Sequence, residues 1–147
     1  MKIRSLIPAL ILTLTSCGGG GGGGGSTLAG TWNLTLVQYQ DDCNLDNSSI
    51  ITPTYLVNQD GTNVAAENLA SGFTFTGGTV EGGSGFVATR TGDVVPCPTG
   101  QNAAIEQTMI FQDVRGNTAP EVDIVVSFTC PFIGECTVAW TGNGERV

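Results

Sequence analysis

Alternating apolar and polar side chains mark Glu121-Val122-Asp123-Ile124-Val125-Val126-Ser127-Phe128-Thr129-Cys130, with Val125 as the one exception. A period of two residues is typical of a β-strand that buries one face. A second alternating run, Cys136, Val138 and Trp140, follows after a short link that begins with Pro131. Two such runs joined by a short link predict an antiparallel hairpin. We therefore expect a fold built from antiparallel strands.

The same period recurs along most of the chain from residue 27 to residue 147, and no window of eleven residues shows a helical period. Residues 65–70 alone also fit a helical turn. The alternating runs predict eight strands, at 31–40, 51–58, 62–66, 72–76, 79–90, 105–112, 121–130 and 136–142. Eight sequential strands with short links are typical of an all-β, antiparallel up-and-down barrel, and a two-sheet β-sandwich is the alternative.

The N-terminus is interpreted as a lipoprotein signal. Lys2 and Arg4 precede the apolar residues 6–14, a stretch too short for a permanent membrane helix and typical of a secretory signal peptide. The run Leu14-Thr15-Ser16-Cys17 resembles the bacterial lipobox, where the signal is cut before a cysteine that then carries palmitate-like acyl chains. Several acyl chains on one residue anchor a protein stably. We predict a signal peptide at residues 1–16 and a lipidated Cys17.

A run of eight glycines at residues 18–25, closed by Ser26, follows that cysteine. Such a run is too flexible to hold a fixed conformation, so residues 17–26 are predicted to be a tether with a reach of about 15 to 18 Å. Glycine directly after the cysteine resembles lipoproteins that are sorted to the outer membrane. The prediction is a domain at residues 27–147, held off the outer membrane of the bacterial envelope.

Charge and composition exclude several classes of function. The chain has 13 acidic residues, five Lys or Arg and no His. Beyond the signal only Arg90, Arg115 and Arg146 are basic, which argues against nucleic acid as a partner. Without His the common catalytic triads and zinc sites are absent. Residues 41–47 begin with the spacing of a calcium loop but lack its glycine and final glutamate. We predict no enzymatic activity, no cofactor and no metal.

The segment Leu28-Ala29-Gly30-Thr31-Trp32 resembles the Gly-x-Trp motif that opens lipocalins and related calycin barrels. In those barrels the tryptophan plugs the closed end, and an arginine just after the last strand stacks across it. Arg146 stands at the matching place, so the resemblance implies that Arg146 covers Trp32. The chain lacks the Thr-Asp-Tyr motif and an evident C-terminal helix, and its pattern resembles small lipocalin-like bacterial lipoproteins more than full-length lipocalins.

Four cysteines remain after Cys17, and an even number in an exported domain favours two disulfides. Three pairings of Cys43, Cys97, Cys130 and Cys136 are possible. We favour Cys130 with Cys136 across a hairpin, which leaves Cys43 with Cys97. In an up-and-down barrel all four lie at one end, opposite both termini and therefore facing away from the membrane.

Seven apolar side chains of the predicted inner face would either line a ligand pocket or simply fill a small barrel, and we favour filling. They are Phe73, Phe75, Phe86, Met109, Phe111, Phe128 and Trp140. The predicted function is a non-enzymatic envelope lipoprotein that binds a small apolar ligand or an envelope partner at its outward end, with residues 41–47 and 94–101 as the rim. The alternatives are a barrel similar to periplasmic protease inhibitors and a β-sandwich module that recognises carbohydrate or protein.

Overall fold

The computed structural model describes residues 27–44, 49–97, 100–131 and 134–147, with backbone only at residues 93–96. Predictions for residues 1–26, including the signal peptide, acylated Cys17 and the tether, fall outside this part. No helix long and apolar enough to span a membrane occurs among these residues. The described chain is all-β, with the strands β1 (Gly30–Asp41), β2 (Ile50–Ile51), β3 (Thr54–Asp60), β4 (Asn63–Asn68), β5 (Thr74–Thr79), β6 (Phe86–Pro96), β7 (Asn102–Gln112), β8 (Thr118–Cys130) and β9 (Gly134–Arg146).

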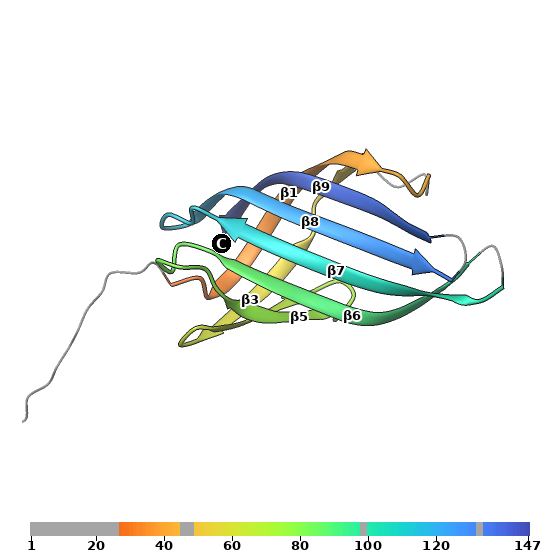
Figure 1. Ribbon diagram of the computed structural model, residues 1–147. Coiled ribbons are helices and arrows are strands. Elements are labelled where there is room, and N and C mark those ends of the chain that lie inside the picture. Colours follow the sequence, from red (N-terminus) through yellow and green to blue (C-terminus); the bar gives the residue numbers. More distant parts are fainter. Residues whose placement is uncertain (1–26, 45–48, 98–99, 132–133) are drawn as a thin grey trace, which may run out of the picture.

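One continuous sheet closes on itself to form a barrel (Figure 1). Neighbouring strands follow chain order from β3 to β9, and β1 closes the sheet by pairing with β3 on one side and β9 on the other. All pairings are antiparallel. The predicted eight-stranded up-and-down barrel is therefore confirmed, and the β-sandwich alternative is wrong because no second sheet exists among the described strands.

The ninth strand, β2, arises because the predicted strand 51–58 is interrupted. Both β2 and β3 lie along β1, where β2 pairs with Leu36 and Val37. Between them Pro53 has no N–H for the ladder, although its carbonyl still accepts a bond from the Leu34 amide at 3.0 Å. The proline thus divides one barrel strand into two short pieces.

The helical-turn alternative and one strand boundary differ from the structure. Residues 65–70 do not form a helical turn, since β4 extends through residue 68. The predicted strand 79–90 starts too early, because β5 continues to Thr79 and the chain turns before Phe86. Gly77 lies within β5 instead of in a turn, and a Cβ there would clash with the Val87 carbonyl oxygen on β6. The glycine allows the two strands to approach closely.

The strands differ in height at one end of the barrel. A short turn at residues 69–73 joins the end of β4 to the start of β5. β5 pairs only with residues Phe86 to Thr89 of β6. The rest of β6, up to Pro96, pairs with β7 alone. β6 to β9 together with β1 therefore form a tall wall, and the β4–β5 hairpin forms a low one (Figure 1).

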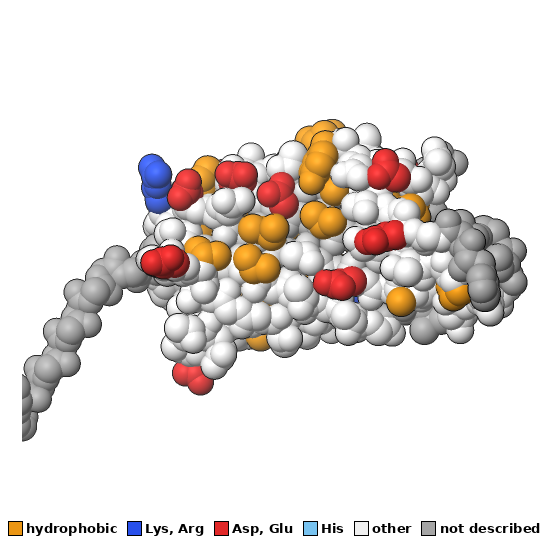
Figure 2. Space-filling view, viewed as in Figure 1, with side chains coloured by type: hydrophobic (Ala, Val, Ile, Leu, Met, Phe, Trp, Pro, Cys, Tyr) orange, Lys and Arg blue, Asp and Glu red, His pale blue; other side chains and the backbone are white. Residues whose placement is uncertain are grey.

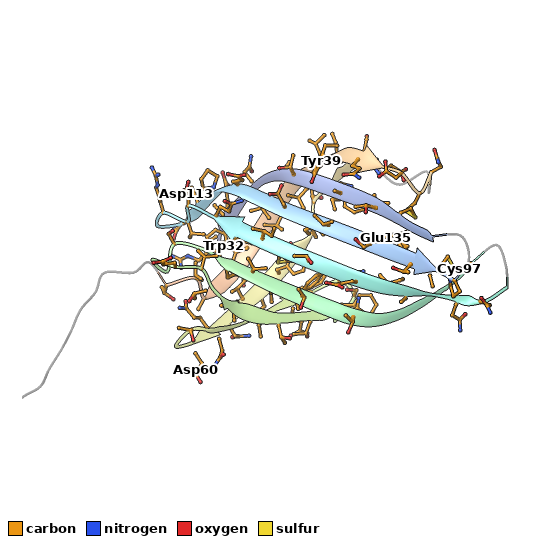
Figure 3. The ribbon with its side chains drawn as sticks, in the orientation of Figure 1. Trp32, Tyr39, Asp60, Cys97, Asp113 and Glu135 are labelled. Atoms are coloured by element: carbon orange, nitrogen blue, oxygen red, sulfur yellow. A yellow bond between two sulfur atoms is a disulfide. The ribbon has the colours of Figure 1, made fainter. Side chains whose placement is uncertain are left out.

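All four cysteines lie at this uneven end, which we call the disulfide end. Figure 3 shows Cys97 at this end and Trp32 at the opposite end, which we call the Trp32 end. The predicted pairing of the cysteines is wrong: Cys43 bonds Cys136, and Cys97 bonds Cys130. The cause is the register of the β8–β9 hairpin, which places Cys130 opposite Gly134 and Cys136 opposite Phe128. Cys136 therefore bonds Cys43, which follows β1, and Cys130 bonds Cys97, which follows β6.

The hydrophobic core is densest towards the Trp32 end. Trp32, Phe86 and Phe111 are all 0% exposed. The Phe111 ring meets Trp32 edge-on at 5.6 Å and stacks on Phe86 at 4.5 Å between centroids. Leu34 and Met109 add further fully buried volume around these rings. In this half of the barrel the inward side chains therefore fill the interior.

Candidate functional site at the disulfide end

The Trp32 end of the barrel is closed by Arg146, as the sequence predicted. The guanidinium carbon lies 5.6 Å from the Trp32 ring centroid, and the backbones of the two residues are partners in the β1–β9 ladder. The Arg146 N–H groups reach the carbonyls of Thr27, Ala29 and Gly116 at 2.7, 3.1 and 2.8 Å. Nε and Nη2 also donate to Asn117 Oδ1, at 3.1 and 2.9 Å.

A glycine makes room for this arginine. Gly30 has a φ of +141°, and a Cβ at this position would lie 2.6 Å from Arg146 Cδ. Any other residue would be strained in its backbone and would displace the arginine. Gly30 of the Gly-x-Trp motif therefore leaves space for the Arg146 side chain that covers Trp32.

The described chain also enters the barrel at this end. The Leu28 carbonyl accepts a hydrogen bond from Trp32 Nε1 at 2.9 Å, and the Leu28 amide donates to Gln59 Oε1 at 2.9 Å. Val147 at the other terminus donates its amide to the Thr31 carbonyl at 3.0 Å. Both termini of the barrel are thus fixed at the Trp32 end, and the disulfide end is the one directed away from them.

Towards the disulfide end a few polar residues join the inner face, although Ile105 and Ala103 continue its apolar series on β7. Arg90 has the same strand parity as the buried Phe86 and Ala88, and Gln107 that of the buried Met109. The two are register partners, and Arg90 Nη1 donates to Gln107 Oε1 at 3.3 Å. The Arg90 guanidinium carbon also lies 3.6 Å from the ring centroid of Phe73. A cation thus occupies an inward position of the barrel wall.

Gln38 is a third inward polar residue, and we use the name inner polar cluster for Gln38, Arg90 and Gln107, of which Arg90 and Gln107 are in contact. It follows the buried Leu36 at the same parity of β1 and is the register partner of Trp140 on β9. Its Nε2 atom is buried and has no hydrogen-bond partner among the described residues. Buried amide groups are nearly always paired, so this atom marks an incomplete polar environment.

Tyr55 lies below the cluster, 4% exposed, with its ring edge-on to Phe75 at 6.0 Å between centroids. Burial raises the pKa of the Tyr55 hydroxyl above its ordinary value of 10.0. A hydrogen bond with Asn68 and the charge of Arg90 act in the opposite direction and reduce this rise. At neutral pH the phenol is therefore protonated.

The seven predicted pocket residues are spread over three environments. Phe75, Phe86, Met109 and Phe111 are buried in the core, with at most 2% exposure. Trp140 is 8% exposed and Phe128 packs against the core while partly buried, both nearer the disulfide end. Phe73 is 44% exposed and lies under Arg90, so the expectation that it faces a buried interior is wrong. The predicted list mixes core residues with residues of the end region.

The inner polar cluster was not predicted from the sequence. The sequence did contain an indication of it. Gln38, Arg90 and Gln107 stand at strand positions where the alternation predicts inward, apolar residues. The predicted rim is described only in part. Gln40 Nε2 donates to Asp42 Oδ2 at 2.6 Å, and the Asp42 amide bonds the Thr137 carbonyl, whereas residues 45–48 and 98–99 lie outside the described chain.

Several hollows open on the outer surface of the barrel. One of about 540 Å³ lies across β6 to β9 and is lined by residues that include Glu106 and Glu135, and one of about 720 Å³ lies between turns near Thr27. Figure 2 shows acidic side chains spread over the visible face. Within the described part of the chain no three potential metal-ligating side chains gather.

The fold and the site define a small closed antiparallel β-barrel with an apolar, arginine-capped end and a disulfide-bonded end whose inner face also holds polar side chains. Comparison with family models, curated proteins and solved structures finds no match for this chain. Any function must therefore be inferred from the signals in the sequence and from the chemistry of the two ends.

Proposed function

We propose that the protein is a non-enzymatic lipoprotein of the bacterial cell envelope, anchored to the outer membrane through acylated Cys17. Its lipocalin-like barrel binds a small apolar ligand, or an envelope partner, at the disulfide end. The lipobox-like Leu14 to Cys17 supports the anchor. The tether precedes Leu28, whose hydrogen bonds lie at the Trp32 end. A membrane anchor would then hold the Trp32 end towards the lipid and present the disulfide end outwards.

One observation carries the binding proposal: Gln38 Nε2 is buried without a partner among the described residues, next to Trp140 in the β1–β9 register. Ligand sites are mostly apolar with a few placed polar groups that orient the ligand. Phe73 and Trp140 supply the apolar surface and Gln38 supplies an unused donor. Nothing comparable is described at the Trp32 end, where the arginine donors meet backbone carbonyls and Asn117.

Binding is tested with the mature chain, residues 17–147, carrying Cys17→Ala so that no acyl chain or detergent competes for the probe. The neutral, apolar dye N-phenyl-1-naphthylamine is added and its fluorescence is followed. We expect saturable enhancement, weakened severalfold by Phe73→Ser at the disulfide end. The control Val87→Ser removes a side chain of similar exposure, 38% against 44%, from the outer face of β6 and should bind normally. No saturable binding, or equal loss in both variants, would contradict a ligand site at this end.

A further inference from the structure

We propose that Arg146 protects the domain from proteases that cut after arginine or lysine, because it holds the β7–β8 turn, residues 113–117, in a conformation that such an enzyme cannot bind. When this hold is lost, the enzyme hydrolyses one bond, Arg115–Gly116. The proposal concerns the Trp32 end and does not depend on the ligand site proposed for the disulfide end. It is carried by the scarcity of basic residues, the hydrogen bonds of the turn and the positions of the disulfides.

Basic residues are scarce in the domain, and all of them lie in the described part of the chain. Beyond the signal the sequence holds no lysine and only Arg90, Arg115 and Arg146. Arg90 lies within β6, half-buried, with its guanidinium carbon 3.6 Å from the Phe73 ring centroid. Arg146 ends β9, and only Val147 follows it. Arg115 alone is both exposed and in a turn between strands, which is where folded proteins are usually nicked.

The Arg115 carbonyl, which a protease would attack, is engaged inside the turn. Its oxygen accepts hydrogen bonds from the Thr118 amide and from Thr118 Oγ1, both at 3.1 Å. The Arg115 amide donates to the Thr118 carbonyl at 2.9 Å, so the two residues form a closed pair around Gly116 and Asn117. A serine protease must receive this same carbonyl oxygen in its oxyanion hole and bind the flanking residues in an extended form. The turn therefore has to open before the bond can be cut.

Both sides of the bond are also fixed to the rest of the barrel. On the N-terminal side Val114 is 2% exposed, and its amide donates to the Ser84 carbonyl at 2.7 Å. On the C-terminal side the Arg146 guanidinium donates to the Gly116 carbonyl at 2.8 Å and twice to Asn117 Oδ1, at 3.1 and 2.9 Å. The Arg146 amide donates to the Asn117 carbonyl, also at 2.8 Å. Arg146 thus holds the two residues that follow the scissile bond.

Local opening of this turn controls the rate of cleavage. Proteolysis of a folded domain follows the population of the opened state when opening and closing are fast. Alanine at position 146 removes three side-chain hydrogen bonds to the turn and leaves the β7–β8 ladder in place. We expect the opened state to become at least about tenfold more populated. Hydrolysis then transfers the OH of water to the Arg115 carbonyl carbon and a proton to the Gly116 nitrogen.

Both disulfides bridge this bond. Cys43 and Cys97 precede Arg115 in the chain, and their partners, Cys136 and Cys130, follow it. A mature chain cut between residues 115 and 116 therefore stays one covalent unit and separates into residues 17–115 and 116–147 only after reduction. This behaviour gives the cleavage a signature that cutting elsewhere does not reproduce.

The test uses trypsin on the mature Cys17→Ala chain with its disulfides intact, followed over time by mass spectrometry with and without reduction. We expect this chain to stay intact under conditions that digest its reduced form in urea. Arg146→Ala should be cut at Arg115–Gly116 at least about tenfold faster, giving one species before reduction and two after it. Adding Arg115→Gln to Arg146→Ala should restore resistance, which also shows that the variant is otherwise folded.

A matched control separates the local effect from a general loss of stability. Cys97→Ala combined with Cys130→Ala destabilises the barrel from the disulfide end and leaves the hydrogen bonds of the β7–β8 turn in place. It should resist cleavage at Arg115 as well as the chain with both disulfides does. Rapid cutting at Arg115 while Arg146 is present, or first cutting of Arg146→Ala at Arg90, would overturn the inference. So would equal cutting at Arg115 in Arg146→Ala and the disulfide variant, or an Arg146→Ala chain that stays uncut.

Discussion

Replacing Arg146 by alanine tests whether the Trp32 end is held by a single side chain. The guanidinium has five N–H groups, and hydrogen bonds connect it to three backbone carbonyls and to Asn117 Oδ1. These acceptors belong to the chain before β1 and to the β7–β8 turn, which the arginine joins across the end of the barrel. Alanine would leave the carbonyls to water and uncover the edge of Trp32.

The expected loss follows from these contacts. Five hydrogen bonds at the low end of the usual range, about 0.7 kcal/mol each for a partly exposed side chain, contribute roughly 3.5 kcal/mol. The contact with the indole face adds about 0.7 kcal/mol, and the ordering of a long side chain costs about 2 kcal/mol. The net expectation is a loss of about 2 kcal/mol in the free energy of unfolding. In a domain of this size that is a fall of roughly 6 to 10 °C in Tm.

The assay is thermal and urea unfolding of the mature chain, followed by circular dichroism. Arg115→Ala is the matched control, because it removes an exposed arginine from the same end and should change Tm by less than about 2 °C. Arg146→Lys keeps the charge without the planar fork and should fall between the two. A double-mutant cycle with Asn117→Ala should give a coupling of about 1 kcal/mol. An Arg146→Ala midpoint equal to that of Arg115→Ala would refute the reasoning.

Three further outcomes are expected. Since burial raises the pKa of Tyr55, the stability that its protonated hydroxyl contributes is complete below pH 10 and is lost as pH rises through the higher folded-state pKa. In the variant Tyr39→Phe, Tyr55 is the only tyrosine, so the phenolate absorbance reports its titration. A midpoint at or below pH 10 would contradict the raised pKa. Opening the 33-residue loop with Cys97→Ala and Cys130→Ala should lower the free energy of unfolding by roughly 4 kcal/mol, and a non-reduced peptide map should join those two cysteines. Cys17→Ser should abolish palmitate labelling and membrane fractionation, and unchanged fractionation would argue against the anchor.

The sequence predicted the barrel because its strands have one buried and one exposed face. In runs such as Val122 to Cys130 the alternation of apolar and polar residues has only one exception, Val125. The short links between the runs make consecutive strands pair with each other. The contact between Arg146 and Trp32 was predictable for a related reason. In a closed sheet the first and last strands are neighbours, so residues near the start of one and the end of the other must meet.

The disulfide pairing depended on a detail that alternation does not encode. Cys130 and Cys136 have the same parity, and parity alone is compatible with a bond between them. Pairing of Cys130 with Gly134 sets the hairpin two residues away from that arrangement. A glycine with a φ of +109° at residue 134 accommodates this tighter turn. The register of a single hairpin therefore redirected both disulfides.

The inner polar cluster escaped prediction because its members look like exceptions to the pattern that reveals the strands. Gln38 and Gln107 lie within the predicted strands 31–40 and 105–112, and Arg90 ends the predicted strand 79–90, so each was treated as a break in an apolar series and not as a candidate site residue. The structure shows that the strands continue beyond them, β6 to Pro96 and β7 from Asn102. Polar residues at inward positions of a continuing strand were thus the sequence signal of the candidate site.

The two disulfides divide the site end into a braced side and an unbraced side. Cys43–Cys136 links the chain after β1 to β9, and Cys97–Cys130 links the chain after β6 to the end of β8, so both brace the tall wall. Among the described residues the β4–β5 hairpin carries no disulfide, and the Phe73 ring beside it contacts the Arg90 guanidinium on β6. Because local opening follows the weakest packing, this hairpin is the element that can move while the cluster on β1, β6 and β7 keeps its geometry. The disulfides thus brace the tall wall and leave the β4–β5 hairpin without a covalent link to it.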